Sequence, residues 1–181
     1  MPKRFLFMTL FLSLSLLVPL SFAGSYPGFK ELKSKDCTAL DSQSIQKLPS
    51  RWEKYEQFIK ICSLLKSSHS SAKVAIVSIW TDDYMNSQSK RMWEDFPLTI
   101  LVDENLNEIG TLPEIFPMDS RTEPIIYYGR WKSGIPTEIK VDVYNPTVSG
   151  DYYYAPLTWD EKRRRYHMID KEPKFGPRPK H

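Results

Sequence analysis

Residues 50–66 read SRWEKYEQFIKICSLLK, and this stretch decides the fold that the sequence predicts. Ser50 and Glu53 stand at the spacing of a capping box, which marks the start of a helix. Apolar side chains then recur at steps of three and four residues, as on one face of a helix: Trp52, Tyr55, Phe58, Ile59, Cys62 and Leu65. We therefore predict one main amphipathic helix over about 50–66, with Cys62 on its buried face.

The chain has two cysteines, Cys37 and Cys62. In an oxidising compartment such a pair most simply forms one disulfide, which would hold the preceding segment 24–49 against the helix. Crosslinking over this spacing stabilises a fold by about 3 kcal/mol. The three histidines are scattered and no C-x-x-C motif occurs, so we expect neither a metal site nor a redox site. No motif indicates a cofactor.

The sequence changes to β-strand composition after residue 73. Residues 74–80 are apolar except for Ser78, which is typical of a largely buried strand. Residues 138–144 alternate strictly, which predicts that Lys140, Asp142 and Tyr144 face solvent. The segment 81–95 fits either a short helix or a hairpin. The remaining predicted strands cover 98–103, 109–112, 125–131, 152–159 and 163–169.

These segments together predict an α+β fold, in which one helix packs on a mostly antiparallel sheet of about six strands. The C-terminal strands form a β-meander. We expect a single globular domain over 24–170, with an irregular arm at 24–49 and the sheet at 73–169. The tail at 171–181 is rich in Lys, Arg and Pro, which predicts a disordered basic segment.

The first residues have the pattern of a signal peptide. Lys3 and Arg4 precede an apolar stretch, and Ser21-Phe22-Ala23 is a small-x-small cleavage site. We predict cleavage after Ala23 and a periplasmic or secreted protein, with an uncleaved anchor helix as the alternative. Removing Lys3 and Arg4 from 25 basic residues leaves 23 against 22 acidic ones. This near balance gives no reason to expect a nucleic-acid partner.

The C-terminal strands carry many aromatic residues and the basic run 162–165. Exposed Tyr and Trp rings suit contacts with a protein or a glycan, although the same rings could instead pack the core. The candidate partner-binding residues are Trp131, Tyr152, Tyr154, Trp159, Arg163 and Arg165. The sequence therefore favours a non-catalytic exported interaction module that binds a protein or glycan of the cell envelope, with membrane contact that is at most peripheral.

Two other functions stay open. An envelope hydrolase could use carboxylates from the pairs Asp82-Asp83, Glu94-Asp95 and Asp103-Glu104. Neighbouring residues on a strand point to opposite faces, so the fold would have to bring carboxylates from different pairs together, and no catalytic residue is assigned. The third possibility is a structural subunit of a bacterial envelope or secretion assembly. The sequence does not decide the oligomeric state.

Overall fold

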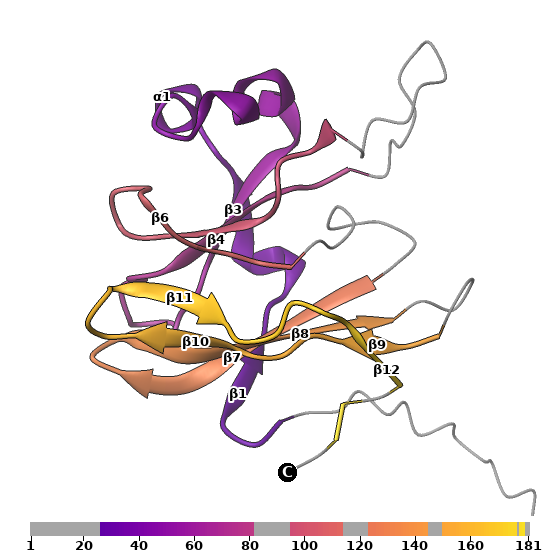
Figure 1. The fold of residues 1–181 in the computed structure, drawn as a ribbon. Helices are drawn as coiled ribbons and strands as arrows, with labels where there is room; N and C mark the ends of the chain where they lie inside the picture. Colours follow the sequence, from indigo (N-terminus) through magenta and orange to yellow (C-terminus); the bar gives the residue numbers. More distant parts are fainter. Residues whose placement is uncertain (1–25, 82–94, 114–122, 145–149, 177, 180–181) are drawn as a thin grey trace, which may run out of the picture.

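The structure is a computed structural model of the 181-residue chain, and it describes residues 26–81, 95–113, 123–144, 150–176 and 178–179. Strands hold 43% of this part of the chain and helical segments 14%, so the protein is mostly β (Figure 1). In chain order the elements are β1 (Phe29–Glu31), η1 (Ser34–Asp36), β2 (Cys37–Ala39), α1 (Ser42–Ile45), η2 (Ser50–Phe58), β3 (Ile59–Ser63), β4 (Ala75–Ile79), β5 (Ile100–Val102), β6 (Glu108–Thr111), β7 (Glu123–Lys132), β8 (Ile135–Tyr144), β9 (Tyr152–Tyr153), β10 (Leu157–Asp160), β11 (Arg165–Met168) and β12 (Lys174–Phe175).

Five strands form one antiparallel sheet in the order β2-β3-β4-β5-β6. The apolar run 74–80 supplies its central strand, β4, and every residue of that strand is buried. β3 runs beside β4 over five residue pairs, from Ile59 opposite Ile79 to Ser63 opposite Ala75. A strand buried on both faces has no polar side, which explains why all its residues but Ser78 are apolar; the Ser78 hydroxyl is hydrogen-bonded to that of Thr99.

The predicted helix over 50–66 is wrong. The 3-10 helix η2 ends at Phe58, and β3 follows directly at Ile59. Ile59 and Ile61 pack under the helical segments, while Cys62 lies in the core on the opposite side of the sheet. Of the residues that suggested one helical face, Ile59 and Cys62 therefore lie on opposite faces of a strand, and Trp52, Tyr55 and Phe58 belong to η2. A strand covered on both sides is apolar at most positions, so it also satisfies a spacing of three and four residues.

The second sheet has seven strands, with β1-β7-β8-β10-β11 as its main order. β9 pairs with β8 and also with β12. β7 and β8 form a long hairpin whose turn residues, Ser133 and Gly134, both have positive φ, at 50° and 82°. Two such residues match the twist of the adjoining strands, which favours a tight two-residue turn. β10 pairs with β8 on one side and β11 on the other, so β11 is the last strand of this order.

The molecule has three layers. The helical segments α1 and η2 cover one face of the five-stranded sheet, and the seven-stranded sheet packs against its other face (Figure 1). The core under the helical segments includes Trp52, Ile59, Val77 and Ile100, and the core between the sheets includes Ile76, Leu101, Ile126, Ile139 and Leu157. The predicted α+β arrangement of one helix on a single sheet is therefore wrong. Alternation locates strands, but it does not say that they divide between two sheets.

The two ends of the described chain are built into these sheets. The segment predicted as an irregular arm, 24–49, contributes β1 to the seven-stranded sheet and β2 to the five-stranded one. In the tail predicted to be disordered, β12 pairs with β9, and the side chain of Arg178 is only 7% exposed. Amino-acid composition did not predict the ordered structure of either segment. Backbone pairing and one buried ion pair hold these segments, and neither requires apolar periodicity.

The predicted disulfide between Cys37 and Cys62 is confirmed. The two residues are direct partners in β2 and β3, with Cα atoms 4.0 Å apart, so the bond ties an edge strand to its neighbour. No helix in the described part of the chain is long and apolar enough to cross a bilayer. The predicted leader 1–23 and residues 82–94 of the ambiguous segment lie outside the described residues.

Candidate binding groove

A groove of about 830 Å³ lies where the edge of the seven-stranded sheet meets the end of β6. All four residues of β11 line it. Neighbouring side chains of a strand point to opposite faces, so a groove that touches every one of them runs along the edge of the strand. We call this feature the basic groove; its lining is Leu98, Thr111, Leu112, Pro113, Tyr154, Asp160, Arg163, Arg165, Tyr166, His167, Met168, Lys171 and Pro173.

The two sheets are fixed close together at this groove. A Cβ atom added at Gly110 of β6 would lie 2.9 Å from Cβ of Tyr166, so any larger residue at 110 would push β6 and β11 apart. The hydroxyl of Tyr166 donates to the carbonyl of Pro136, which fastens β11 to the start of β8. Burial raises the pKa of Tyr166, so this hydroxyl keeps its proton at neutral pH. The floor of the groove is therefore held by close packing and by this hydrogen bond.

Asp160 shapes the hairpin that carries the basic side chains. Its Oδ1 atom accepts hydrogen bonds from the backbone N–H groups of Lys162 and Arg163, at 2.9 and 3.1 Å. The bond from Arg163 is the main reason that the pKa of Asp160 lies below its usual value. The same carboxylate lies 3.7 Å from the Arg163 guanidinium. The negative charge of Asp160 is thus engaged within the turn.

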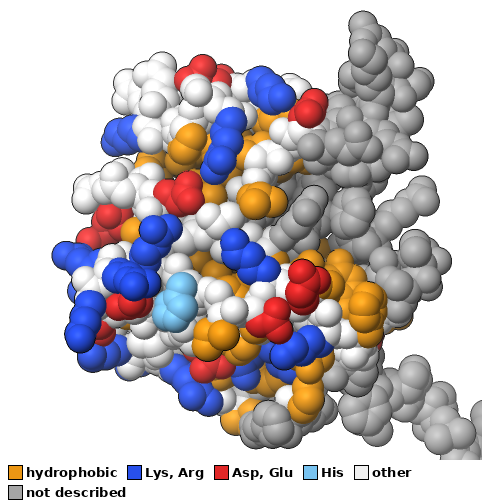
Figure 2. Space-filling model, in the orientation of Figure 1, with side chains coloured by type: hydrophobic (Ala, Val, Ile, Leu, Met, Phe, Trp, Pro, Cys, Tyr) orange, Lys and Arg blue, Asp and Glu red, His pale blue; other side chains and the backbone are white. Residues whose placement is uncertain are grey.

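The groove carries an excess of positive charge. Arg163, Arg165 and Lys171 contribute three cations, and Asp160 is the one carboxylate among the described lining residues. Arg165 and His167 are exposed on the same side of β11. Neither Arg165 nor Lys171 has an ion pair within the described part of the chain, whereas Nε2 of His167 lies 3.3 Å from the Thr158 hydroxyl. Figure 2 shows blue Lys and Arg side chains gathered over the β10–β11 hairpin.

Apolar groups lie beside these charges. Leu98 is 42% exposed, and Met168 is half-buried. Leu112 and Tyr166 form a buried part of the lining. Just beyond β11, Ile169 is 87% exposed. Such a groove suits a ligand that places anionic groups against the cations and apolar groups against the floor.

The structure brings three of the predicted partner-binding residues together. Arg163 and Arg165 line the basic groove, and so does Tyr154. Tyr154 is 7% exposed and belongs to the core between the sheets, so it contributes little surface to the groove.

The other predicted aromatic residues do not line the groove. Their rings pack against the core between the sheets and against neighbouring rings, at centroid distances of 5.1 to 5.9 Å. The pairs are Trp159 with Tyr166, Trp131 with Tyr128, and Tyr152 with Tyr154. These rings offer less contact area to a partner than the sequence suggested.

Several groove residues were not among the predicted ones: Leu98, Asp160, His167 and Lys171. Strand alternation does place His167 on the same side as Arg165, and that signal could have added it to the set. Leu98 reaches the groove from a distant segment, so no local pattern could have identified it, whereas Lys171 follows closely after β11.

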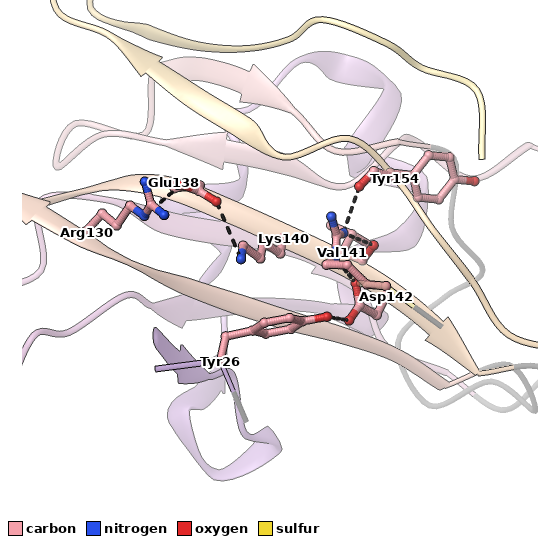
Figure 3. A network of polar contacts seen from close by, with 8 residues as sticks. Tyr26, Arg130, Glu138, Lys140, Val141, Asp142 and Tyr154 are labelled. Atoms are coloured by element: carbon pink, nitrogen blue, oxygen red, sulfur yellow. Dashed lines mark hydrogen bonds and ion pairs between the residues drawn. The ribbon is translucent and has the colours of Figure 1, made fainter. Parts of the chain in front are cut away.

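A second polar cluster lies on the outer face of the seven-stranded sheet (Figure 3). We call it the terminal clasp, because Tyr26 and Arg178, near the two ends of the chain, both bind Asp142. The Tyr26 hydroxyl donates to Oδ2 of Asp142 at 2.6 Å, and Nε of Arg178 donates to Oδ1 at 2.7 Å. Arg178 also donates to the carbonyls of Val141 and Tyr154, at 3.1 and 2.7 Å. Burial, followed by the bond to Asp142, raises the pKa of Tyr26.

The row of charges continues from the clasp along β8. The ammonium of Lys140 lies 4.3 Å from the ring centres of both Tyr26 and Phe29. Burial lowers the pKa of Lys140, although Glu138, 3.7 Å away, acts in the opposite direction. Glu138 in turn pairs with Arg130 at 3.0 Å. Lys140 and Asp142, predicted to face solvent, are instead half-buried, because the two ends of the chain cover this face.

The described residues contain no group of three or more His, Cys, Asp or Glu side chains that could hold a metal ion. Of the carboxylate pairs, Asp82-Asp83 and Glu94 lie outside the described residues. Asp103 accepts hydrogen bonds from the backbone of Asn105 and Asn107 and from the Asn107 side chain. Partial burial opposes them, but these bonds keep the pKa of Asp103 low, as expected for a residue that holds a turn.

Comparison of the chain with family models, with curated proteins and with solved structures finds no match.

Proposed function

We propose that the protein is an exported, non-catalytic binding module and that its basic groove holds an anionic partner. The observation that carries this proposal is the position of Arg165 and Lys171, which have no ion-pair partner among the described residues and lie beside an apolar floor. A guanidinium offers several donors in a fixed plane and matches the oxygens of a carboxylate, sulfate or phosphate group. Binding energy would come from these charges together with the burial of Leu98 and Met168.

Export is supported by the sequence of residues 1–23 and by the disulfide between Cys37 and Cys62. Disulfides of this structural kind persist in oxidising compartments and are rare in the cytosol. Intact-mass analysis of the protein purified from its source, without reductant, tests this step. We expect a chain that begins at Gly24 with both thiols oxidised, and a chain that retains Met1 would contradict export by cleavage.

The groove is tested with three anionic probes that differ in chemistry: an acidic peptide, a sulfated polysaccharide such as heparin, and vesicles of phosphatidylglycerol. Binding is measured by fluorescence anisotropy or co-sedimentation at low and moderate salt. We expect at least one probe to bind, and we expect salt to weaken that binding, because exposed charges are screened. The double variant Arg165→Glu/Lys171→Glu should lower the affinity by about tenfold or more, since two attractive contacts become repulsive.

Lys47→Glu is the matched control. Lys47 is exposed beside α1, on the far side of the five-stranded sheet, and its replacement by Glu changes the net charge as much as the single groove variant Arg165→Glu, with which it is compared. We expect its affinity for every probe to equal that of the unchanged protein. If the control and the groove variant lose affinity equally, binding depends on net charge and not on the groove. If none of the probes binds, the proposed function fails.

A further inference from the structure

The basic groove follows a strand edge that carries backbone groups as well as side chains. β11 is the last strand in the order of its sheet, and no strand of the described residues pairs with its outer side. In an antiparallel pair, every second residue directs its N–H and C=O groups away from the partner strand. β11 therefore presents backbone donors and acceptors along the groove, in addition to the cations described above. Such an edge is a template for one more strand.

The side chains of β11 divide by charge between the two faces of the sheet. Arg165 and His167 are exposed on the outer face, while Tyr166 and Met168 point toward the core between the sheets. A strand added beside β11 would place its own side chains on the same two faces, opposite these residues. In the added strand, acidic residues would be favoured beside Arg165 and His167. Residues beside Tyr166 and Met168 would be favoured as apolar, since they would enter the groove next to Leu112.

The chain beyond β11 extends this apolar and basic edge. Ile169 is 87% exposed and Phe175, on β12, is 72% exposed. Single exposed apolar residues are common on protein surfaces, but these two follow one sheet edge together with the exposed cation of Lys171. An extended partner longer than four residues would therefore continue to meet apolar groups and Lys171, with Asp170 and Glu172 also in this segment and Asp170 paired with Lys174 at 3.7 Å.

We infer that the basic groove docks an extended acidic peptide of a partner protein, which adds to the seven-stranded sheet as a strand beside β11. The inference rests on the proposed function and specifies the partner and its binding mode. The peptide alternates acidic and apolar residues. A sulfated or phosphorylated polymer could satisfy Arg165 and Lys171, but it has no regular ladder of N–H and C=O groups for the edge of β11. A peptide satisfies the charges, the backbone and the apolar floor at once.

The test uses the purified protein with its disulfide intact and a fluorescent seven-residue peptide in which Glu and Val alternate. Two derivatives carry N-methyl groups, one on the valines and the other on the glutamates. In an extended peptide all valine N–H groups point to one edge and all glutamate N–H groups to the other. Only one set can face β11, so we expect one derivative to lose about tenfold or more in affinity and the other to bind within about threefold of the parent peptide.

A second measurement keeps the outcome clear. Hydrogen exchange of the β11 amides is followed with and without the parent peptide, and we expect slower exchange at alternate residues of 165–168. If both methylated peptides bind as well as the parent, or if heparin binds while the peptide does not, strand addition is wrong and anion binding by the groove remains. If the peptide, heparin and the phosphatidylglycerol vesicles all fail to bind, and Arg165→Glu/Lys171→Glu therefore changes nothing, the proposed function fails as well.

Discussion

The terminal clasp and the basic groove both use arginines from the last part of the chain, yet they engage these charges in opposite ways. Arg178 has a side chain that is 7% exposed, and it donates to Asp142 and to two backbone carbonyls. Arg165 is exposed on an edge strand without a partner among the described residues. The first arginine closes the fold, because its donors are satisfied inside the molecule. The second makes no ion pair with the described residues, and in our proposal its donors bind another molecule.

This difference could not be judged from the two local sequences. The run 162–165 has a strong basic signal, whereas Arg178 stands alone in a Pro-rich tail. What separates them is a carboxylate 36 residues before Arg178, which the fold carries to it. Removing either arginine, or the tyrosine that shares the clasp, tests whether the contrast is real.

The largest effect is expected for Arg178→Ala. The substitution removes an ion pair that is largely buried and leaves Asp142 and two carbonyls with fewer donors. We expect the free energy of unfolding at pH 7 to fall by about 2–3 kcal/mol, below the range for fully buried pairs because Asp142 is partly exposed. Urea unfolding followed by Trp fluorescence measures it.

Arg178→Lys is the control for charge alone. Lysine keeps the positive charge but lacks the planar fork that reaches three acceptors, so we expect it to recover only part of the loss. If Arg178→Ala unfolds at the same urea concentration as the unchanged protein, the clasp does not hold the fold and the contrast with the groove disappears.

A smaller effect, which depends on pH, is expected for Tyr26→Phe. At pH 7 the loss of the hydroxyl bonded to Asp142 should cost about 1–2 kcal/mol of unfolding free energy. The folded pKa of Tyr26 is raised above the unfolded value, so its contribution is complete below about pH 10 and declines as the pH rises further. The stability difference between the two proteins should therefore shrink by about 1 kcal/mol between pH 8 and pH 11.

Urea titrations of both proteins at several pH values measure that difference. Tyr166 also has a raised pKa, but it is present in both proteins and cancels in the comparison. A stability difference that stays constant up to pH 11 would show that the Tyr26 hydroxyl is not protected in the folded state.

The smallest effect on stability is expected for Arg165→Ala. An exposed side chain that makes no ion pair should change the free energy of unfolding by less than about 0.5 kcal/mol. The same urea titration measures this change, and anisotropy measures the affinity for the probe that binds the groove. A stability loss as large as that of Arg178→Ala would place Arg165 in the structure of the fold and not in a free binding surface.

Much of the local structure follows from short patterns in the sequence. The predicted strand 138–144 lies within β8, and the run 74–80 contains β4. The disulfide between Cys37 and Cys62 was predicted from the number of cysteines and the proposed compartment. This prediction did not depend on the predicted fold. Alternation and turn residues are local patterns. Strands predicted from them can therefore be correct even when the predicted architecture is wrong.

The architecture could not be predicted because apolar periodicity does not distinguish one face of a helix from the two faces of a buried strand. Ile59 and Cys62 fit one face of a helix and, equally, the two faces of a buried strand. Pairing with β4 and with β2 selects the strand, and β2 is separated from β3 by the helical segments α1 and η2. The groove was predicted only in part for the same reason: Arg163 and Arg165 belong to one hairpin, whereas Leu98 comes from a distant segment of the chain.

Because both described ends of the chain bind Asp142, the protein is suited to circular permutation. Tyr26 and Arg178 contact the same carboxylate, so the described ends lie side by side and a short flexible linker could join them. New ends could then be opened in the exposed turn at Ser133-Gly134. A circularly permuted protein of this design would keep both sheets while replacing a noncovalent closure by a covalent one.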